Sequence, residues 1–201
     1  MTRICVITSD GRAYYALVSR LRNAGLPFLS MLPADTSGEC ELVLTTRSEA
    51  GLFHGITMVL EDLDDEPGVV RSQILSRLAG GNGALTIGID PGLRIGMAAF
   101  YGETRIASRT FNSRSRLCSG VVRLVKKTEA GRSVVRIGNG DPAQASWIAA
   151  RLAHRLPRTV IEIVDESGTS LRSPRAKGIQ RDQSAAAKIA FRKGPVLHPP
   201  G

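Results

Sequence analysis

Aromatic residues are scarce in this chain of 201 residues, at 4%. A protein that stacks successive bases of a single strand on aromatic side chains is therefore not expected. Long apolar runs are also missing, since none approaches the roughly 20 residues that cross a bilayer. Near the N-terminus, Asp10, Gly11 and Arg12 interrupt the apolar residues too early for a signal peptide. We therefore expect no membrane partner.

Cysteine is sparse as well. Cys5, Cys40 and Cys118 are odd in number and far apart in the sequence. This spacing favours neither a zinc site nor a disulfide framework, and it is typical of a reducing compartment. We therefore expect free thiols and a cytoplasmic location. The apolar share of 42% is ordinary for a protein with a packed core.

Negative charge is scarce in the C-terminal half only. Residues 1–85 hold 7 Lys/Arg and 10 Asp/Glu, a net charge of −3. Residues 86–201 hold 20 Lys/Arg and 8 Asp/Glu, a net charge of +12. Solubility alone does not require so much charge on one half of a small protein. The asymmetry indicates a polyanionic partner, and nucleic acid is the natural one.

Residues 1–80 predict a small α/β accessory domain of unknown role. Apolar runs typical of strands alternate with two amphipathic helices, one of which begins at Pro67. The first strand–loop–helix lacks the glycine spacing of a dinucleotide site. The acidic stretch 61–66 reads better as a solvated loop than as a metal site. A Gly-rich stretch at 79–84 then marks the domain boundary.

The next segment, 85–101, predicts a β-hairpin. Ile87 and Ile89 share one face of its first strand, and Gly88 and Asp90 share the other. Pro91 begins the turn. Asp90 therefore ends a buried strand beside a residue without a side chain. This sequence is consistent with a simple turn cap as well as with a functional carboxylate.

The remaining residues complete a second domain at 85–195. A third strand follows at 103–111, and then a basic helix at 115–130. Two further strands alternate with two helices, the last of which begins at Asp182, and 196–201 form an irregular tail. This order predicts an α/β domain with a mixed five-stranded sheet: three antiparallel strands, then parallel strands with helical crossovers.

The same residues carry a family resemblance. The segment 88–96, Gly-Ile-Asp-Pro-Gly-Leu-Arg-Ile-Gly, resembles the opening motif of ribonuclease-H-like proteins of the YqgF and RuvC (Holliday-junction-resolvase-like) type, and of the matching domain of Tex-type proteins. Three more stretches are similar to later motifs of these families, in family order: 137–140, 165–170 and 182–192. The resemblance covers about residues 85–195.

The resemblance implies a catalytic acidic set of Asp90, Glu166 and Asp182 that holds Mg²⁺ or Mn²⁺. Carboxylates from separate elements suit these ions, which assist phosphodiester hydrolysis. The alternation along the strand favours Asp165 over Glu166 as the polar residue on the apolar face, whereas the motif favours Glu166. Resolvases of the RuvC type use four acids. The nearest fourth, Asp141, reads better as a helix N-cap.

Cations and glycines surround this predicted site. We expect the following residues to bind nucleic acid: Arg94, Arg172, Arg175, Lys177 and Arg181. Gly92, Gly138 and Gly140 would allow a phosphate to approach the backbone.

Three functions follow as hypotheses. The leading one is a Mg²⁺-dependent nuclease on structured DNA or RNA, with a homodimer required for resolvase action. The second is a nucleic-acid-binding module of the Tex type that does not cut. The third is an actin-type ATPase or kinase, because Gly-Ile-Asp-Pro-Gly also resembles its phosphate loop; such proteins need two copies of the fold, and 116 residues hold one.

Overall fold

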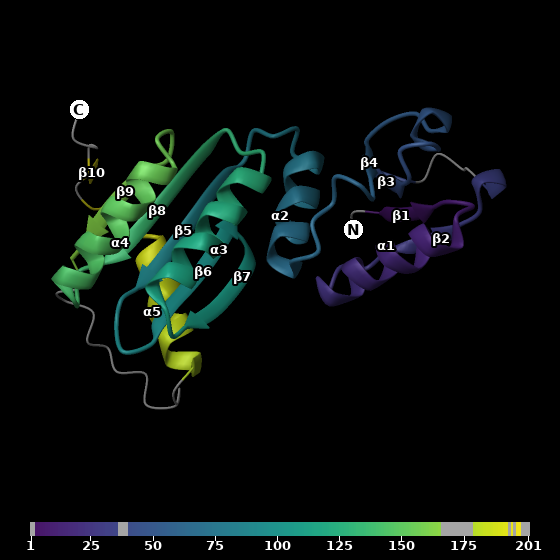
Figure 1. The fold of residues 1–201 in the computed structure, drawn as a ribbon. Coiled ribbons are helices and arrows are strands. Elements are labelled where there is room, and N and C mark those ends of the chain that lie inside the picture. The colour runs from purple at the N-terminus through teal and green to yellow at the C-terminus, as the bar shows by residue number, and fades with distance from the viewer. Residues whose placement is uncertain (1–2, 36–39, 166–178, 193, 195, 198–201) are drawn as a thin grey trace. The chain divides into compact units, whose positions relative to one another are not determined.

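The computed structural model describes residues 3–35, 40–165, 179–192, 194, 196 and 197. The chain divides into two compact units, Met1–Gly81 and Asn82–Gly201, and the boundary falls in the Gly-rich stretch. The predicted α/β class is confirmed in both units (Figure 1).

Unit 1 is a parallel sheet with the strand order β2-β1-β3-β4. Its regular elements are β1 (Ile4–Ile7), α1 (Gly11–Asn23), β2 (Leu29–Met31), β3 (Leu42–Thr45), β4 (Thr57–Val59) and α2 (Pro67–Leu78), with single 3-10 turns at Pro33–Asp35 and Ala50–Leu52. Asp10 caps α1 by accepting from the backbone N–H of Arg12 at 2.8 Å, and Gly25 follows the helix with φ +62°. These local signals are legible in the sequence.

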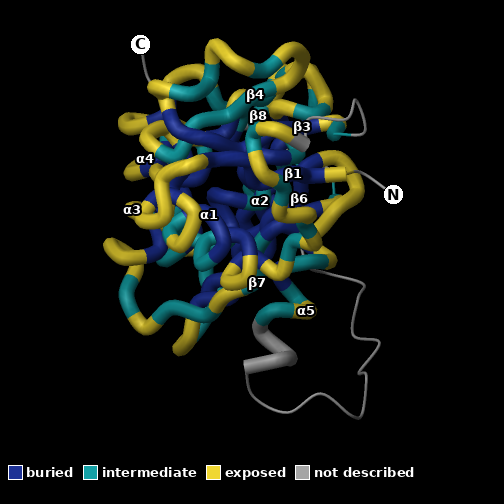
Figure 2. Tube along the Cα trace, turned by 90° about the vertical axis from the view of Figure 1, so that its right-hand side faces the viewer, coloured by how far each residue is buried: buried dark blue, intermediate teal, exposed yellow. Residues whose placement is uncertain are grey.

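The core of unit 1 lies between its sheet and the two helices. Leu17 and Leu21 of α1 are buried together with Val70 and Ile74 of α2, against the apolar residues of β1 and β3. In Figure 2 the tube is dark blue along these strands. The acidic stretch 61–66 is less solvated than the sequence predicts, because Leu63 is buried and Glu66 caps α2.

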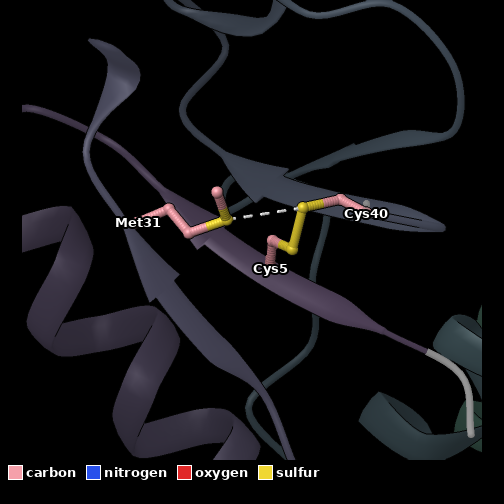
Figure 3. The surroundings of a disulfide bond; sticks show 3 residues. All are labelled: Cys5, Met31 and Cys40. Atoms are coloured by element: carbon pink, nitrogen blue, oxygen red, sulfur yellow. Dashed lines mark hydrogen bonds between the residues drawn. A yellow bond between two sulfur atoms is a disulfide. The ribbon is translucent and has the colours of Figure 1, made fainter. Parts of the chain in front are cut away.

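The prediction that all three cysteines are free thiols is wrong. Cys5 of β1 and Cys40, just before β3, form a disulfide with 5.9 Å between their Cα atoms (Figure 3), a normal separation for such a bond. The two residues are 35 apart in the sequence, and the pairing of β1 with β3 brings them together. The Met31 sulfur lies 3.6 Å from Cys40 Sγ. Since a disulfide sulfur carries no hydrogen, this is a packing contact.

Unit 2 has the order of elements that the sequence predicts. The elements are β5 (Ala84–Asp90), β6 (Ile95–Tyr101), β7 (Thr104–Phe111), α3 (Arg114–Lys127), β8 (Arg132–Gly138), α4 (Pro142–Arg155), β9 (Val160–Val164), α5 (Ile179–Ala190) and β10 (Val196–Leu197). Strands β5, β6 and β7 form an antiparallel meander, and β8 and β9 continue parallel to β5.

Two boundaries in unit 2 differ from the prediction. The sheet has six strands in the order β10-β9-β8-β5-β6-β7, not five. The sixth is Val196–Leu197, which pairs antiparallel with β9 where an irregular tail is predicted. Helix α5 is already helical at Ile179, so Asp182 lies inside it and not at its N-cap. The sixth strand depends on its pairing with β9, which lies far earlier in the sequence.

The helices of unit 2 cover both faces of its sheet. Figure 1 shows α3 and α4 on one face and α5 on the other. The α3–α4 face holds the largest buried side chains, including Ile87, Ile89 and Ile137. Within the described ranges, no helix combines the length and the apolarity that crossing a bilayer demands.

Candidate functional site

Asp90 ends β5 at the sheet edge where the parallel strands β5, β8 and β9 all finish. As the sequence predicts, Ile87 and Ile89 are fully buried on one face of β5. Gly88 faces α5, and Asp90 follows it on that same face. Asp90 itself is half-buried. A carboxylate in this position is accessible from the sheet edge yet held by a rigid strand.

Gly88 allows α5 to lie directly on the sheet. A Cβ atom at Gly88 would be 2.0 Å from the backbone oxygen of Ala186 and 2.6 Å from the backbone nitrogen of Ala190. Both alanines are fully buried. Small residues on both elements therefore bring α5 close to the sheet.

The direction of α5 places position 182 toward Asp90. Near the end of the helix, the Phe191 ring lies 4.7 Å from the Phe100 ring, and Phe100 is paired with Thr86, two residues before Gly88. The start of α5 therefore lies toward the Asp90 end of β5. Position 182 is one helical turn before Ala186, about 6 Å along the axis, and Asp90 is about 6.6 Å beyond Gly88. The two positions are at a similar level of the sheet.

A buried ion pair under α5 was not predicted. Arg136 of β8 donates to the Glu162 carboxylate of β9 at 2.7 Å, and the two side chains are 15% and 7% exposed. Arg136 also donates to the backbone oxygen of Ala190 in α5. The three residues Gly88, Arg136 and Glu162 are neighbours across the sheet. The sequence signal for this pair is a single charged residue in the middle of each of two apolar strands. Only the register of the two strands shows that these residues are neighbours.

The end of β9 is not adjacent to Asp90. Strand β8 lies between β5 and β9, so the two strand ends are about 9–10 Å apart. Gly138 stands between them, opposite Val164 and beside the end of β5. Because Gly138 has no side chain, no side chain of β8 occupies the space between Asp90 and the end of β9.

Several predicted site residues fall outside the described side chains. Glu166, Arg172, Arg175 and Lys177 lie outside the described residues, and Arg181 and Asp182 are described only as part of the backbone of α5. Of the others, Arg94 is exposed in the turn after β5, and Asp165 is exposed after β9. Gly92 is half-buried in that turn, Gly138 is buried, and Gly140 is exposed before α4.

The N-cap interpretation of Asp141 is confirmed. Its carboxylate accepts from the backbone N–H of Gln144 at 3.0 Å and from the Gln144 side chain at 3.2 Å. These hydrogen bonds lower the pKa of Asp141, and the charge of Arg114 contributes in the same direction. Asp141 is therefore engaged at the start of α4.

The donor chemistry at Asp90 suits a hard cation, because a carboxylate at a strand end is a typical Mg²⁺ ligand. Among the described residues, however, no three His, Cys, Asp or Glu side chains gather closely enough to hold a metal ion. The other two predicted ligands, at 166 and 182, are not among the described side chains. Asp90 is thus the one member of the predicted set whose side chain is described.

A second polar cluster lies in unit 1, where β1 and β3 end. The Glu49 carboxylate accepts from the hydroxyl groups of Thr8 (2.5 Å), Ser9 (2.5 Å), Thr46 (2.7 Å) and Thr45 (3.3 Å), and from the Ser9 backbone N–H (2.8 Å). Burial opposes ionisation, but these hydrogen bonds outweigh it and lower the pKa of Glu49 to about 2. The cluster holds together the loops at this end of the sheet. Its hydroxyl groups and its backbone N–H all donate to the Glu49 carboxylate of the same chain.

No protein-family model matches the chain, and a comparison with curated proteins gives no match.

Proposed function

We propose that unit 2 is a ribonuclease-H-like domain of the YqgF/RuvC type that hydrolyses phosphodiester bonds in structured DNA or RNA. The observation that carries the proposal is the placement of Asp90: it ends a central strand, beside a glycine on which α5 lies, with position 182 near its level. The meander followed by parallel strands supports the same assignment.

In this proposal Asp90, Glu166 and Asp182 hold Mg²⁺ or Mn²⁺. When bound, the ion would supply a low-pKa water and neutralise charge on the phosphate. The protein's own contribution is rigidity. The backbone of β5 fixes Asp90, and the Arg136–Glu162 pair fixes α5 on the sheet. Arg94, exposed beside Asp90, would bind a phosphate next to the one that is cut.

The charge of the chain favours a nucleic-acid substrate over a small phosphoester. A net charge of +12 on residues 86–201 attracts a polyanion along a surface much larger than one site. The resemblance likewise points to branched or otherwise structured nucleic acid.

Cleavage of end-labelled substrates tests the proposal. We would incubate a four-way DNA junction, a DNA–RNA hybrid, duplex DNA and duplex RNA with Mg²⁺, Mn²⁺ or EDTA. The wild type should cut at least one of them only with metal, and Asp90→Asn should cut at least 100-fold more slowly. Glu103→Gln is the matched control, because Glu103 is exposed in the β6–β7 turn, at the opposite edge of the sheet. Equal cutting by wild type and Asp90→Asn would refute the proposal.

A binding module that does not cut is the second candidate. The engagement of Asp141 as an N-cap favours it, since the fourth acid of a RuvC-type set is then missing. In that case the same substrates should bind in EDTA, Asp90→Asn should bind as tightly as the wild type, and no product should form.

A further inference from the structure

A cavity of about 560 Å³ opens at the same sheet edge, on the α3–α4 face. Its walls are the β5–β6 turn, the start of α3 and the first two turns of α4. Gln144 of α4 donates to the backbone oxygen of Gly92 at 3.3 Å and so holds the turn against the helix. The cavity therefore lies at the turn that follows Asp90, and this hydrogen bond links two of its walls. Asp90 is not among the described residues that line it.

Two side chains give the cavity a flat π surface. The Arg114 guanidinium lies over the Trp147 ring, 4.7 Å from its centroid. Trp147 is nevertheless 38% exposed, and both residues line the cavity. Nucleobases stack on indole rings and on arginine planes of this kind. Trp147 is the only tryptophan in a chain with few aromatic residues.

Leu93 stands at the mouth of this cavity with its side chain entirely in solvent, at 106% relative exposure. Exposed leucines are ordinary when isolated. This one is at the tip of a hairpin turn that Gln144 braces, next to the Trp147 cavity. Apolar side chains presented in this way act as wedges between base pairs in proteins that unstack nucleic acid.

The charges inside the cavity favour a base over a phosphate. Ser113 caps α3 and Asp141 caps α4, so both helix N-termini already have an acceptor. The hydrogen bonds from Gln144 keep the pKa of Asp141 low, and its negative charge offsets the positive charge of Arg114, so the described lining carries no net positive charge to attract a phosphate. The same carboxylate accepts readily from an N–H group, such as the exocyclic amine of adenine, cytosine or guanine.

We propose that this cavity takes one unpaired nucleobase of a bound nucleic acid, stacked against Trp147 and Arg114, while Leu93 separates that base from its neighbour. The inference rests on the proposed function, because it assumes nucleic acid at the Asp90 edge. It goes further by assigning a substrate feature, an unpaired or unstacked base, to a particular site. Base recognition and cutting would then belong to opposite faces of one sheet edge.

The fluorescence of Trp147 reports directly on a base that stacks against it. The probe is a 20-base-pair DNA duplex with one bulged 2-aminopurine, together with its RNA counterpart and the fully paired duplexes, all in EDTA to prevent cutting. With the wild type, a bulged probe should quench Trp147 fluorescence and should bind at least about tenfold more tightly than the paired duplex, as measured by anisotropy of an end label. Loss of one stacked base corresponds to roughly 5- to 150-fold in affinity.

Variants distinguish binding of a base in this cavity from nonspecific electrostatic binding of the nucleic acid. Leu93→Ser, Arg114→Gln and Trp147→Ala should each abolish most of the preference for the bulged probe, while binding of the paired duplex changes less than about twofold for Leu93→Ser and Trp147→Ala. Leu52→Ser is the matched control, because Leu52 is an exposed leucine of unit 1 at 68%; it should leave both affinities unchanged. Circular dichroism would confirm that each variant is folded.

The outcomes distinguish this inference from the nuclease proposal. If the bulged and paired probes bind the wild type equally, or neither binds, or Trp147→Ala retains the preference, the base site is refuted whatever cutting is observed. If the preference and its loss in the variants are observed but Asp90→Asn and wild type show the same cutting, the base site stands and the nuclease proposal fails.

Discussion

The Glu49 carboxylate accepts from four hydroxyl groups and one backbone N–H, contributed by the ends of β1 and β3. We expect Glu49→Gln to lower the free energy of unfolding by about 1–2 kcal/mol at pH 7, because hydrogen bonds to a charged group contribute more than those to a neutral one. Urea unfolding of both proteins measures the difference. Glu41→Gln, at an exposed position, is the control and should change little.

The same carboxylate predicts how that difference depends on pH. The pKa of Glu49 is lowered from 4.5 to about 2 in the folded protein, so the unfolded chain binds a proton first as pH falls. The stabilisation from ionised Glu49 is therefore fully present above about pH 5, and it decreases as pH falls toward 2. We expect the gap between wild type and Glu49→Gln to shrink between pH 5 and pH 2.5. A gap that stays constant over this range would contradict the assigned role.

At the scale of elements, the contact of α5 with β5 depends on a missing side chain. Gly88→Ala would place a Cβ against two backbone atoms of α5, which cannot rotate away. We expect a loss of about 1–3 kcal/mol in the free energy of unfolding. The proposed nuclease activity should also fall, because the start of α5 would move relative to Asp90. Gly11→Ala is the control, since nothing lies within 4 Å of its Cβ, and a helical Gly→Ala change stabilises slightly.

The ion pair beneath α5 makes a second prediction for this element. Arg136→Met leaves Glu162 buried without its partner, and we expect a cost of about 3–5 kcal/mol. The double variant Arg136→Met, Glu162→Leu removes both charges and should recover part of that loss. A double-mutant cycle from urea unfolding measures the coupling between the two side chains. Additive effects of the two single substitutions would show that the pair does not act as a unit.

Elements that depend on local signals could be predicted from the sequence, and contacts between distant strands could not. Pro67 and Asp141 mark the starts of their helices as predicted, because an N1 proline and an N-cap each act only on the first turn of their own helix. The Cys5–Cys40 disulfide joins β1 to the residues just before β3, and the Arg136–Glu162 pair joins β8 to β9, so both follow from strand pairing and register. Trp147 and Arg114 lie on separate helices and meet only because the fold places both helix starts at one edge. The predicted acidic set is of this second kind, and only Asp90 among its side chains is described.

At the scale of the whole molecule, the disulfide makes the two units respond differently to reductant. The bond closes a loop of 35 residues in unit 1, which corresponds to about 3–4 kcal/mol of stabilisation. We expect dithiothreitol, or Cys5→Ser, to lower the unfolding midpoint of unit 1 while that of unit 2 is unchanged. Hydrogen exchange followed by mass spectrometry reports on both units in one sample. Equal loss of protection in both would show that they do not unfold separately.

The charge distribution makes the last prediction for the whole molecule. Residues 1–85 carry a net charge of −3 and residues 86–201 a net charge of +12, so phosphate contacts should come from unit 2. Affinity for a duplex should fall linearly on a plot of log K against log salt, with a slope of about −0.9 for each phosphate neutralised. Arg94→Gln should reduce that slope by about one phosphate contact, whereas Arg47→Gln should leave it unchanged, because Arg47 belongs to unit 1 and pairs with Asp62 at 2.6 Å. An equal reduction of the slope by both substitutions would mean that unit 1 also contacts the nucleic acid. The prediction that the phosphate contacts come from unit 2 would then be wrong.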